Sequence, residues 1–197
     1  MKKTLLSLSL VGCLISSAPA AVYQFTALLT GGNEIPANSS PGVGFALVHY
    51  DDVASTIEVH ALFAALQGTT TAAHIHAPTA APFSGTAGVA TTTPSFAGFP
   101  AGVTSGSFSN TLSLTASGTY NPAFITANGG TVAGAESALV AALFAGRSYF
   151  NVHTTAYPGG EIRGFFTLVP EPSSFALIAT GAAAVAYKVR RKQRNGA

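Results

Sequence analysis

Hydrophobic and polar residues alternate in short runs along most of the chain between residues 22 and 169. In the first run Tyr23, Phe25 and Leu29 fall on one side of a strand, because successive side chains of a strand point to opposite faces. The same period of two recurs later, with Gly, Pro, Asn or Asp between the runs. It predicts strands over 22–30, 44–50, 55–65, 69–77, 107–120, 148–154 and 161–169.

The segments between the predicted strands are rich in turn-forming residues. We expect loops over 31–41 and 121–134, and loops with one weak strand over the long Thr/Ala/Gly/Pro stretch 78–106. Only 136–145 has apolar residues at helical spacing, and Gly146 is placed to end that helix. Many short strands with one short helix predict a mostly β fold. We expect a single antiparallel β-sandwich over 22–168, Greek-key and immunoglobulin- or dismutase-like.

Composition limits the class of partner. The chain has 197 residues, of which 48% are hydrophobic and 8% charged, enough for one domain with its own core. Of nine Lys and Arg residues, only Arg147 and Arg163 lie between the two ends, so the body is mildly acidic and has no basic patch. We therefore expect no nucleic-acid partner, since phosphate neutralisation needs clustered basic residues. The single cysteine, Cys13, leaves the body without a disulfide.

Residues 1–20 have the three parts of a secretory signal peptide. A basic start is followed by an apolar run over 4–15 and by the small residues Ala18-Pro19-Ala20, which fit a signal-peptidase site. We expect export, with the mature chain beginning near Ala21. An alternative stays open, because Leu10-Val11-Gly12-Cys13 is similar to a bacterial lipobox, which would place a lipid on Cys13.

Residues 169–197 form a second targeting segment. Pro170-Glu171-Pro172 lies in an extended stretch, 169–174, because each Pro disfavours helix in the residue before it. An apolar helix is expected over 175–187 and a basic cluster follows over 188–194. This apolar run is shorter than the ~20 residues that span a bilayer comfortably, but snorkelling basic residues could extend it.

The order of these parts closely resembles the PEP-CTERM sorting signal of Gram-negative bacteria, often those that make exopolysaccharide. The resemblance implies recognition by an exosortase-type membrane peptidase. A plain C-terminal membrane anchor is the alternative. Both place the body outside the cytoplasm, periplasmic, extracellular or on the cell surface, held transiently or permanently by its tail.

Three histidines are the candidate site. His74 and His76 share one face of a predicted strand, and His153 lies on a late strand that leads into the turn Tyr157-Pro158-Gly159-Gly160. If the two strands are neighbours, the three imidazoles can form a nitrogen site for zinc, copper or nickel. Such a site requires their nitrogens within about 4–5 Å of each other. His49 and His60 have no partner in the sequence, and we expect them on the surface.

A structural role is the alternative for these residues. His74 and His76 could hydrogen-bond loop backbone, or Glu34 and Glu161, and so fix the long loops. Asn33 and Glu34 are expected to hold their own loop. Glu161 and Arg163 share one face of the last strand and are expected to form an ion pair, worth ~0–1 kcal/mol if exposed.

Four motifs in order resemble the CHRD (chordin-type) domain common in secreted bacterial proteins. They are 25–36, which ends in Gly-Gly-Asn33-Glu34-Ile-Pro, then 72–78 with His74-Ile75-His76, the helix 138–146, and Asn151-Val-His153 through Gly164. The resemblance covers roughly 22–168. It implies an extracellular β-sandwich with a binding or structural role, and it implies no reaction.

A weaker resemblance is to the Cu/Zn superoxide dismutases, which also carry a His-x-His pair and a late histidine before a Gly-Gly turn. It implies that His74, His76 and His153 match three of the copper ligands. The chain departs from that family in lacking a zinc-site loop and disulfide cysteines, and Glu161 stands where a basic residue is expected.

No nucleophile elbow, P-loop or His-Glu-x-x-His motif occurs, so we expect no enzyme, although metal-dependent redox chemistry stays open. The first hypothesis is a non-enzymatic, exported CHRD protein of the envelope or exopolysaccharide matrix that binds protein or polysaccharide. The second is a copper- or zinc-binding domain built on His74, His76 and His153.

Overall fold

A computed structural model describes residues 21–170, which include every predicted strand. The eight strands are β1 (Val22–Thr30), β2 (Val43–Asp51), β3 (Thr56–Ala64), β4 (Thr70–His76), β5 (Gly106–Ser113), β6 (Tyr149–Thr154), β7 (Ile162–Phe165) and β8 (Thr167–Val169). The expected signal peptide, the lipobox at Cys13 and the segment from Glu171 onward lie outside the described residues. No helix among residues 21–170 is both long and apolar enough to cross a membrane.

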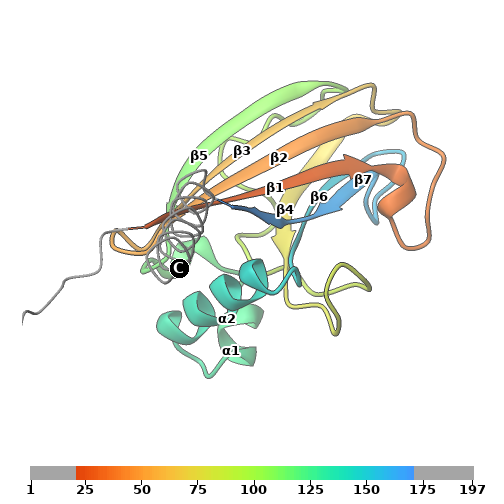
Figure 1. Cartoon of the computed structure of the whole chain (residues 1–197). Helices are drawn as coiled ribbons and strands as arrows, with labels where there is room; N and C mark the ends of the chain where they lie inside the picture. Colours follow the sequence, from red (N-terminus) through yellow and green to blue (C-terminus); the bar gives the residue numbers. More distant parts are fainter. Residues whose placement is uncertain (1–20, 171–197) are drawn as a thin grey trace, which may run out of the picture.

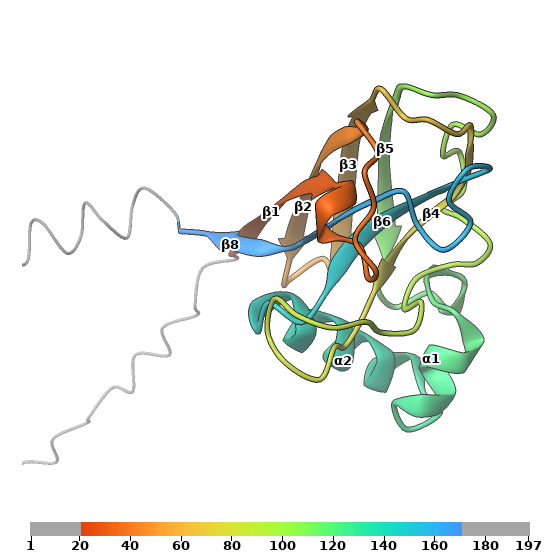
Figure 2. The same cartoon turned by 90° about the vertical axis from the view of Figure 1, so that its right-hand side faces the viewer.

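The strands form one antiparallel sheet in the order β4-β6-β7-β1-β2-β3-β5, with β8 also pairing with β1. The sheet curls into a half-barrel (Figures 1 and 2). The mostly β, antiparallel prediction is confirmed, but the expected sandwich of two facing sheets is wrong. The reason is that β1 hydrogen-bonds on both sides: it pairs with β2 along its whole length, with β7 at Thr30 and with β8 at Gln24–Thr26. The two expected layers are therefore one continuous sheet.

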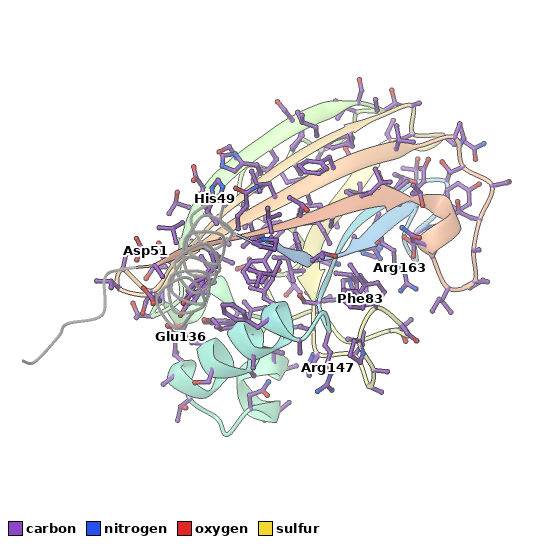
Figure 3. The ribbon with its side chains drawn as sticks, viewed as in Figure 1. His49, Asp51, Phe83, Glu136, Arg147 and Arg163 are labelled. Carbon is purple, nitrogen blue, oxygen red and sulfur yellow. The ribbon has the colours of Figure 1, made fainter. Side chains whose placement is uncertain are left out.

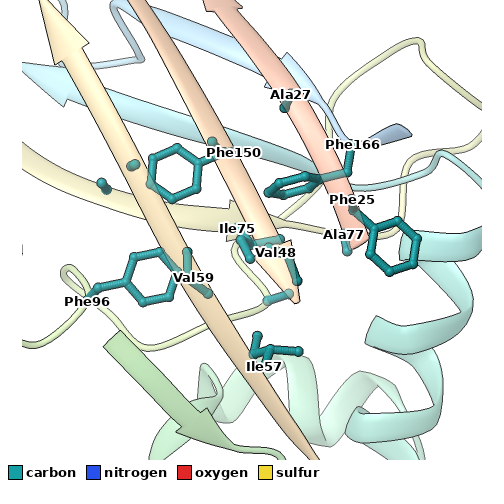
Figure 4. Close-up of a cluster of buried hydrophobic side chains, with 14 of the residues drawn as sticks. Phe25, Ala27, Val48, Ile57, Val59, Ile75, Ala77, Phe96, Phe150 and Phe166 are labelled. Atoms are coloured by element: carbon teal, nitrogen blue, oxygen red, sulfur yellow. The ribbon is translucent and has the colours of Figure 1, made fainter. Parts of the chain in front are cut away.

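The concave face of this sheet holds the core. Alternate residues of each strand point inward, as the period of two predicts, and Phe25, Val48, Ile57, Ile75 and Phe150 are fully buried there (Figure 4). Burying a side chain of this size contributes about 1.5–3 kcal/mol. The last predicted strand, 161–169, is broken into β7 and β8, and Phe166 between them also lies in the core.

The helices differ from the expectation. The predicted helix is longer, α2 (Val132–Phe144), and a second one, α1 (Pro122–Ala127), lies where we expected only a loop. Both lie below the sheet in the view of Figure 1. A local signal for α1 was present: Asn121 caps the helix by accepting a hydrogen bond from the Ala123 N–H, and Pro122 occupies the first turn.

Gly146 ends α2 as predicted. Its φ is +64°, the Gly146 N–H donates to the Leu143 carbonyl, and the Arg147 N–H donates to the Ala142 carbonyl. This is a Schellman motif, which satisfies carbonyls left free at a helix end. The ring of Phe83 packs so closely on Gly146 that an added Cβ would lie 2.4 Å from it. Glycine is therefore required here for both conformation and space.

The stretch between β4 and β5 contains no strand, so the weak strand expected there is wrong. Its backbone is held instead by single bridges, His76 with Val89 and Thr91 with Tyr120. Phe96 is buried and stacks on Phe150 at a ring-centroid distance of 5.9 Å. This long connection therefore packs into the core through Phe96 and runs beside the edge strand β4, where the Ala90 and Phe96 N–H groups donate to the Ile75 and Ala73 carbonyls. The strand expected at 107–120 also ends early, at Ser113, and a 3₁₀ turn (Ser117–Thr119) follows.

Candidate metal centre

The histidines lie on the outer face of β4 and β6, which are hydrogen-bonded neighbours. His74 is paired with Asn151, and Ala72 with His153, so His153 lies diagonally across from His74. Ala73 and Ile75, which alternate with the histidines, are buried in the core. The sequence prediction that His74 and His76 share a face, close to His153, is confirmed.

The imidazoles are in contact with one another. The Nε2 atoms of His74 and His153 are 2.9 Å apart, and the ring centroids of His74 and His76 are 4.8 Å apart. One ring nitrogen from each of the three histidines lies within 4.8 Å of the other two. The spacing expected for a three-nitrogen site is therefore present.

Backbone carbonyls orient two of the rings. The Nδ1 of His153 lies 2.9 Å from the Pro158 carbonyl oxygen, and the Nδ1 of His76 lies 2.8 Å from that of Ala87. A carbonyl can only accept, so Nδ1 carries the proton in both rings. Their Nε2 atoms are therefore unprotonated, and each carries a lone pair that can accept a hydrogen bond or bind a metal. The Nε2 of His76 is buried and has no hydrogen-bond partner in the part of the chain that the structure describes.

If the 2.9 Å contact is a hydrogen bond, its proton is therefore on His74. With Nε2 of His153 unprotonated, the His74 Nε2 donates, and its Nδ1 becomes an unprotonated nitrogen. That Nδ1 is buried without a partner among the described residues. Leaving a buried acceptor unsatisfied costs about 1–3 kcal/mol. The metal-free cluster thus has more acceptors than donors.

All three imidazoles are held neutral. Burial lowers the pKa of His74 to about 3, and the neighbouring rings of His76 and His153 act in the same direction, while the Pro94 carbonyl beside the ring opposes them. Burial lowers the pKa of His76 to about 4 and also lowers that of His153. Neutral imidazole is the form that binds metals.

A buried polar row continues from this cluster along the same face. Asn151 lies between His74 on β4 and Arg163 on β7. The Arg163 guanidinium stacks over the Tyr149 ring at 4.8 Å, and the same tyrosine stacks on His76 at a centroid distance of 4.7 Å. The centre is therefore packed between a charged aromatic stack and two loops.

The expected ion pair between Glu161 and Arg163 is wrong. Arg163 Nε lies 3.7 Å from a carboxylate oxygen of Glu34, and it also donates to the Asn33 carbonyl. The reason is the sheet order, because β7 pairs with β1 and so meets the turn that follows β1 (Figure 3 shows Arg163 at this end). As expected, Asn33 holds its loop: its amide donates to the carbonyls of Leu28 and Arg163.

Glu161 has a different role. It is fully buried just before β7, and its carboxylate accepts hydrogen bonds from the hydroxyls of Ser40 and Thr154 and from the backbone N–H groups of Gln67 and Gly68. Burial raises the pKa of this carboxyl, but the four bonds outweigh it and leave the pKa below its ordinary value. The residue joins three separate segments of the chain.

Glu34 is buried with an orphaned oxygen. Within residues 21–170 its Oε1 has no hydrogen-bond partner, and neither has the buried Oδ1 of Asn151. Both atoms lie 2.7 Å from the point where a Cβ on Gly160 would be. Burial raises the pKa of Glu34 to about 7, against the opposing effect of Arg163. Of the alternative that His74 and His76 hydrogen-bond loop backbone or Glu34 and Glu161, the loop-backbone part is met for His76, which bonds the Ala87 carbonyl, whereas among the described residues neither carboxylate bonds a histidine of the cluster.

The turn after β6, residues 155–160, orients the His153 ring and contacts the loop that contains Gln67. Pro158 supplies the carbonyl to His153, and the Gly160 N–H closes the turn on the Tyr157 carbonyl at 3.0 Å. Gly160 has φ of +131°, which few other residues adopt. The Tyr157 hydroxyl donates to Gln67 and ties the turn to the opposite loop. Gly159 has open space around it.

His49 and His60, expected to be isolated on the surface, share a partner. Both are partly exposed, and each lies against one oxygen of Glu58. The sequence contained a signal for this: β2 and β3 form a hairpin around Asp51-Asp52, and a hairpin register places His49 opposite Glu58. Sequence reasoning did not use that register.

Comparison with known families identifies both parts of the chain. A model described as CHRD domain matches residues 25–166, and one described as PEP-CTERM protein-sorting motif matches residues 168–192. The first match covers well over half of the chain. No curated protein and no solved structure matches significantly.

Proposed function

This chain belongs to the CHRD domain family, and we propose that it is a non-enzymatic, exported binding protein in which His74, His76 and His153 hold a transition-metal ion. The PEP-CTERM motif implies export and exosortase sorting to the cell surface. The proposal places the domain in the envelope or exopolysaccharide matrix.

One observation carries the metal proposal. The Nε2 atoms of His74 and His153 are 2.9 Å apart, the buried Nε2 of His76 has no partner among the described residues, and one ring nitrogen from each histidine lies within 4.8 Å of the other two. Two nitrogens bound to the same ion at ~2.0 Å lie about 2.8–3.3 Å apart, for angles between a right angle and a tetrahedral one. The donor set therefore fits copper or zinc, which imidazole favours. A bound ion would supply a crosslink between β4 and β6 and a positive charge inside the fold.

The surroundings support this donor set. The Nδ1–H groups of His76 and His153 already donate to Ala87 and Pro158, an arrangement that aims Nε2 at a metal and raises its basicity. If His74 moves its proton from Nε2 to Nδ1, that nitrogen can donate to the adjacent Pro94 carbonyl. The change would remove the orphaned acceptors of the metal-free cluster.

Metal retention tests the proposal. The full chain is purified in detergent through a tag without histidine, incubated with Cu²⁺ or Zn²⁺, and passed through gel filtration before metal analysis. We expect about one retained ion per chain, as a three-imidazole site predicts. His74→Ala and the less buried His153→Ala should both lose it.

The controls separate ligand loss from misfolding. His60→Ala removes an imidazole elsewhere and should leave the retained ion unchanged, and circular dichroism should show the same β-rich fold in every variant. A wild-type chain that retains no metal, or a folded His153→Ala chain that retains as much as wild type, contradicts the proposal.

A second function is favoured by an exposed apolar row on the outer face of the sheet. Leu28, Phe45 and Leu62 are direct neighbours across β1, β2 and β3 and are 65%, 44% and 61% exposed. With Val43 they border a shallow groove of about 330 Å³. Exposed apolar patches of this kind mark interaction sites, so we propose a protein partner in the matrix rather than a polysaccharide.

This second function is tested in the producing bacterium. Leu62→Asp should reduce the fraction of the protein retained at the cell surface, because a charge in the row opposes apolar docking. Val53→Asp changes an equally exposed residue in the β2–β3 turn and serves as the matched control. Equal retention of the two variants contradicts the idea.

A further inference from the structure

A second group of metal-ligating side chains lies on the outer face of β2 and β3, away from the buried centre. His49 is directly opposite Glu58 in the strand register, and His60 follows Glu58 by two residues on the same face. Figure 3 shows His49 at the opposite end of the sheet from Arg163. The hairpin therefore places two imidazoles and one carboxylate in a triangle.

The carboxylate lies between the two rings. Its Oε1 is 3.1 Å from His60 Nε2, and its Oε2 is 3.4 Å from His49 Nδ1. The ring centroids of the two histidines are 5.9 Å apart. One ligand atom from each of the three residues lies within 4.8 Å of the others. Small side-chain rotations would bring all three onto one ion at ligand distances of ~2.0–2.2 Å.

The group is open to solvent on its outer side. The side chains of His49, Glu58 and His60 are 31%, 44% and 36% exposed. The group borders a groove of about 370 Å³, which Asp51 and Thr111 also line. Water or a ligand from outside can therefore complete the coordination, which the enclosed three-imidazole cluster does not allow as readily.

From this geometry we infer a second metal site: His49, His60 and Glu58 bind an exchangeable divalent transition-metal ion such as Zn²⁺ on the surface of the sheet. Two imidazoles exclude Mg²⁺ and Ca²⁺, which prefer all-oxygen ligands. Exposure makes the site weaker than the buried one, because water competes for the ion and for the ligands.

Zinc titration of the full chain tests the inference. Isothermal titration in detergent should show a binding step that gel filtration does not preserve. His60→Ala and Glu58→Gln should each weaken this step by at least about tenfold, since the loss of an outer-shell partner of a metal ligand already costs about that much. Glu136→Gln alters a carboxylate on α2 and is the matched control, which should titrate as wild type. All of these positions are at least partly exposed, so the variants should fold.

The outcomes are separate from those for the buried centre. If the buried centre binds nothing, wild type still shows the exchangeable step, and His60→Ala removes it. If Glu58 only accepts hydrogen bonds from the two rings, His60→Ala and wild type give the same titration, and the inference is overturned. A wild-type chain with no exchangeable zinc step overturns it as well.

Discussion

The Nε2 atoms of His74 and His153 lie 2.9 Å apart, although the residues are 79 positions apart in the chain. The antiparallel pairing of β4 with β6 brings them together, and carbonyls from two loops set the ring orientations. A cluster of neutral imidazoles with unsatisfied lone pairs is costly to bury unless something binds those lone pairs.

Zinc should stabilise the folded chain. A ligand that binds only the native state at about 100 times its Kd adds about 2.7 kcal/mol. For a domain of this size that amounts to a rise of roughly 5–10 °C in Tm. Differential scanning calorimetry with and without Zn²⁺ measures it. His153→Ala should keep its fold and lose most of the rise, and an equal rise in both proteins would contradict a role for His153.

Glu161→Gln should destabilise the domain by about 1–3 kcal/mol, the cost of leaving buried hydrogen-bonding groups unsatisfied. Its carboxylate accepts four hydrogen bonds, and an amide would turn a donor toward groups that are themselves donors. Urea unfolding followed by circular dichroism measures the loss. Glu136→Gln, which alters no such network, should change stability far less. Similar midpoints for the two variants would show that the network contributes little.

Glu34→Gln should change how stability depends on pH. The folded-state pKa of Glu34 is raised from 4.5 to about 7, so the folded chain keeps a proton that the unfolded chain releases. Its contribution to stability is fully present below pH 4.5 and is lost as pH rises through 7, by on the order of 3 kcal/mol.

His74, His76 and His153 act in the opposite direction. Their folded-state pKa values are lowered, so they destabilise the metal-free fold as pH falls below about 6.5, the ordinary value. The histidines contribute equally to Glu34→Gln and to wild type, so their contribution cancels when the two free energies of unfolding are subtracted at each pH. That difference should grow in favour of Glu34→Gln between pH 5 and pH 8, measured by urea unfolding without metal. A constant difference would mean that Glu34 is ionised throughout.

Gly146→Ala should lower the free energy of unfolding by about 1–2 kcal/mol for the left-handed backbone, with a further cost from the clash. The new Cβ would meet the ring of Phe83 at 2.4 Å. Gly118→Ala is the matched control, since nothing lies within 4 Å of its added Cβ. Thermal unfolding of both variants decides the matter, and equal Tm values would show that the end of α2 tolerates a side chain.

Several features of this protein could be predicted because their physical cause is local. The period of two places Ile57 and Val59 inward and His74 and His76 together on the outer face. Gly146 ends the helix because its backbone adopts a positive φ, which glycine tolerates, and this property of a single residue can be read from the sequence. The CHRD motifs and the Pro-Glu-Pro tail are contiguous stretches that can be recognised without a fold.

Other features depend on which strands are neighbours, and no local pattern contains that information. The sequence predicted an ion pair between Arg163 and Glu161, its neighbour along the strand. The pairing of β7 with β1 instead brings Arg163 to Glu34, and these two residues form the ion pair. In the same way, β1 joins two expected sheets into one because it finds partners on both edges. The amino-acid sequence by itself determined most of the strands, the faces of their side chains and the PEP-CTERM sorting motif. The tertiary structure alone decided which imidazoles and carboxylates meet, because long-range strand pairing, rather than residue spacing, sets those distances.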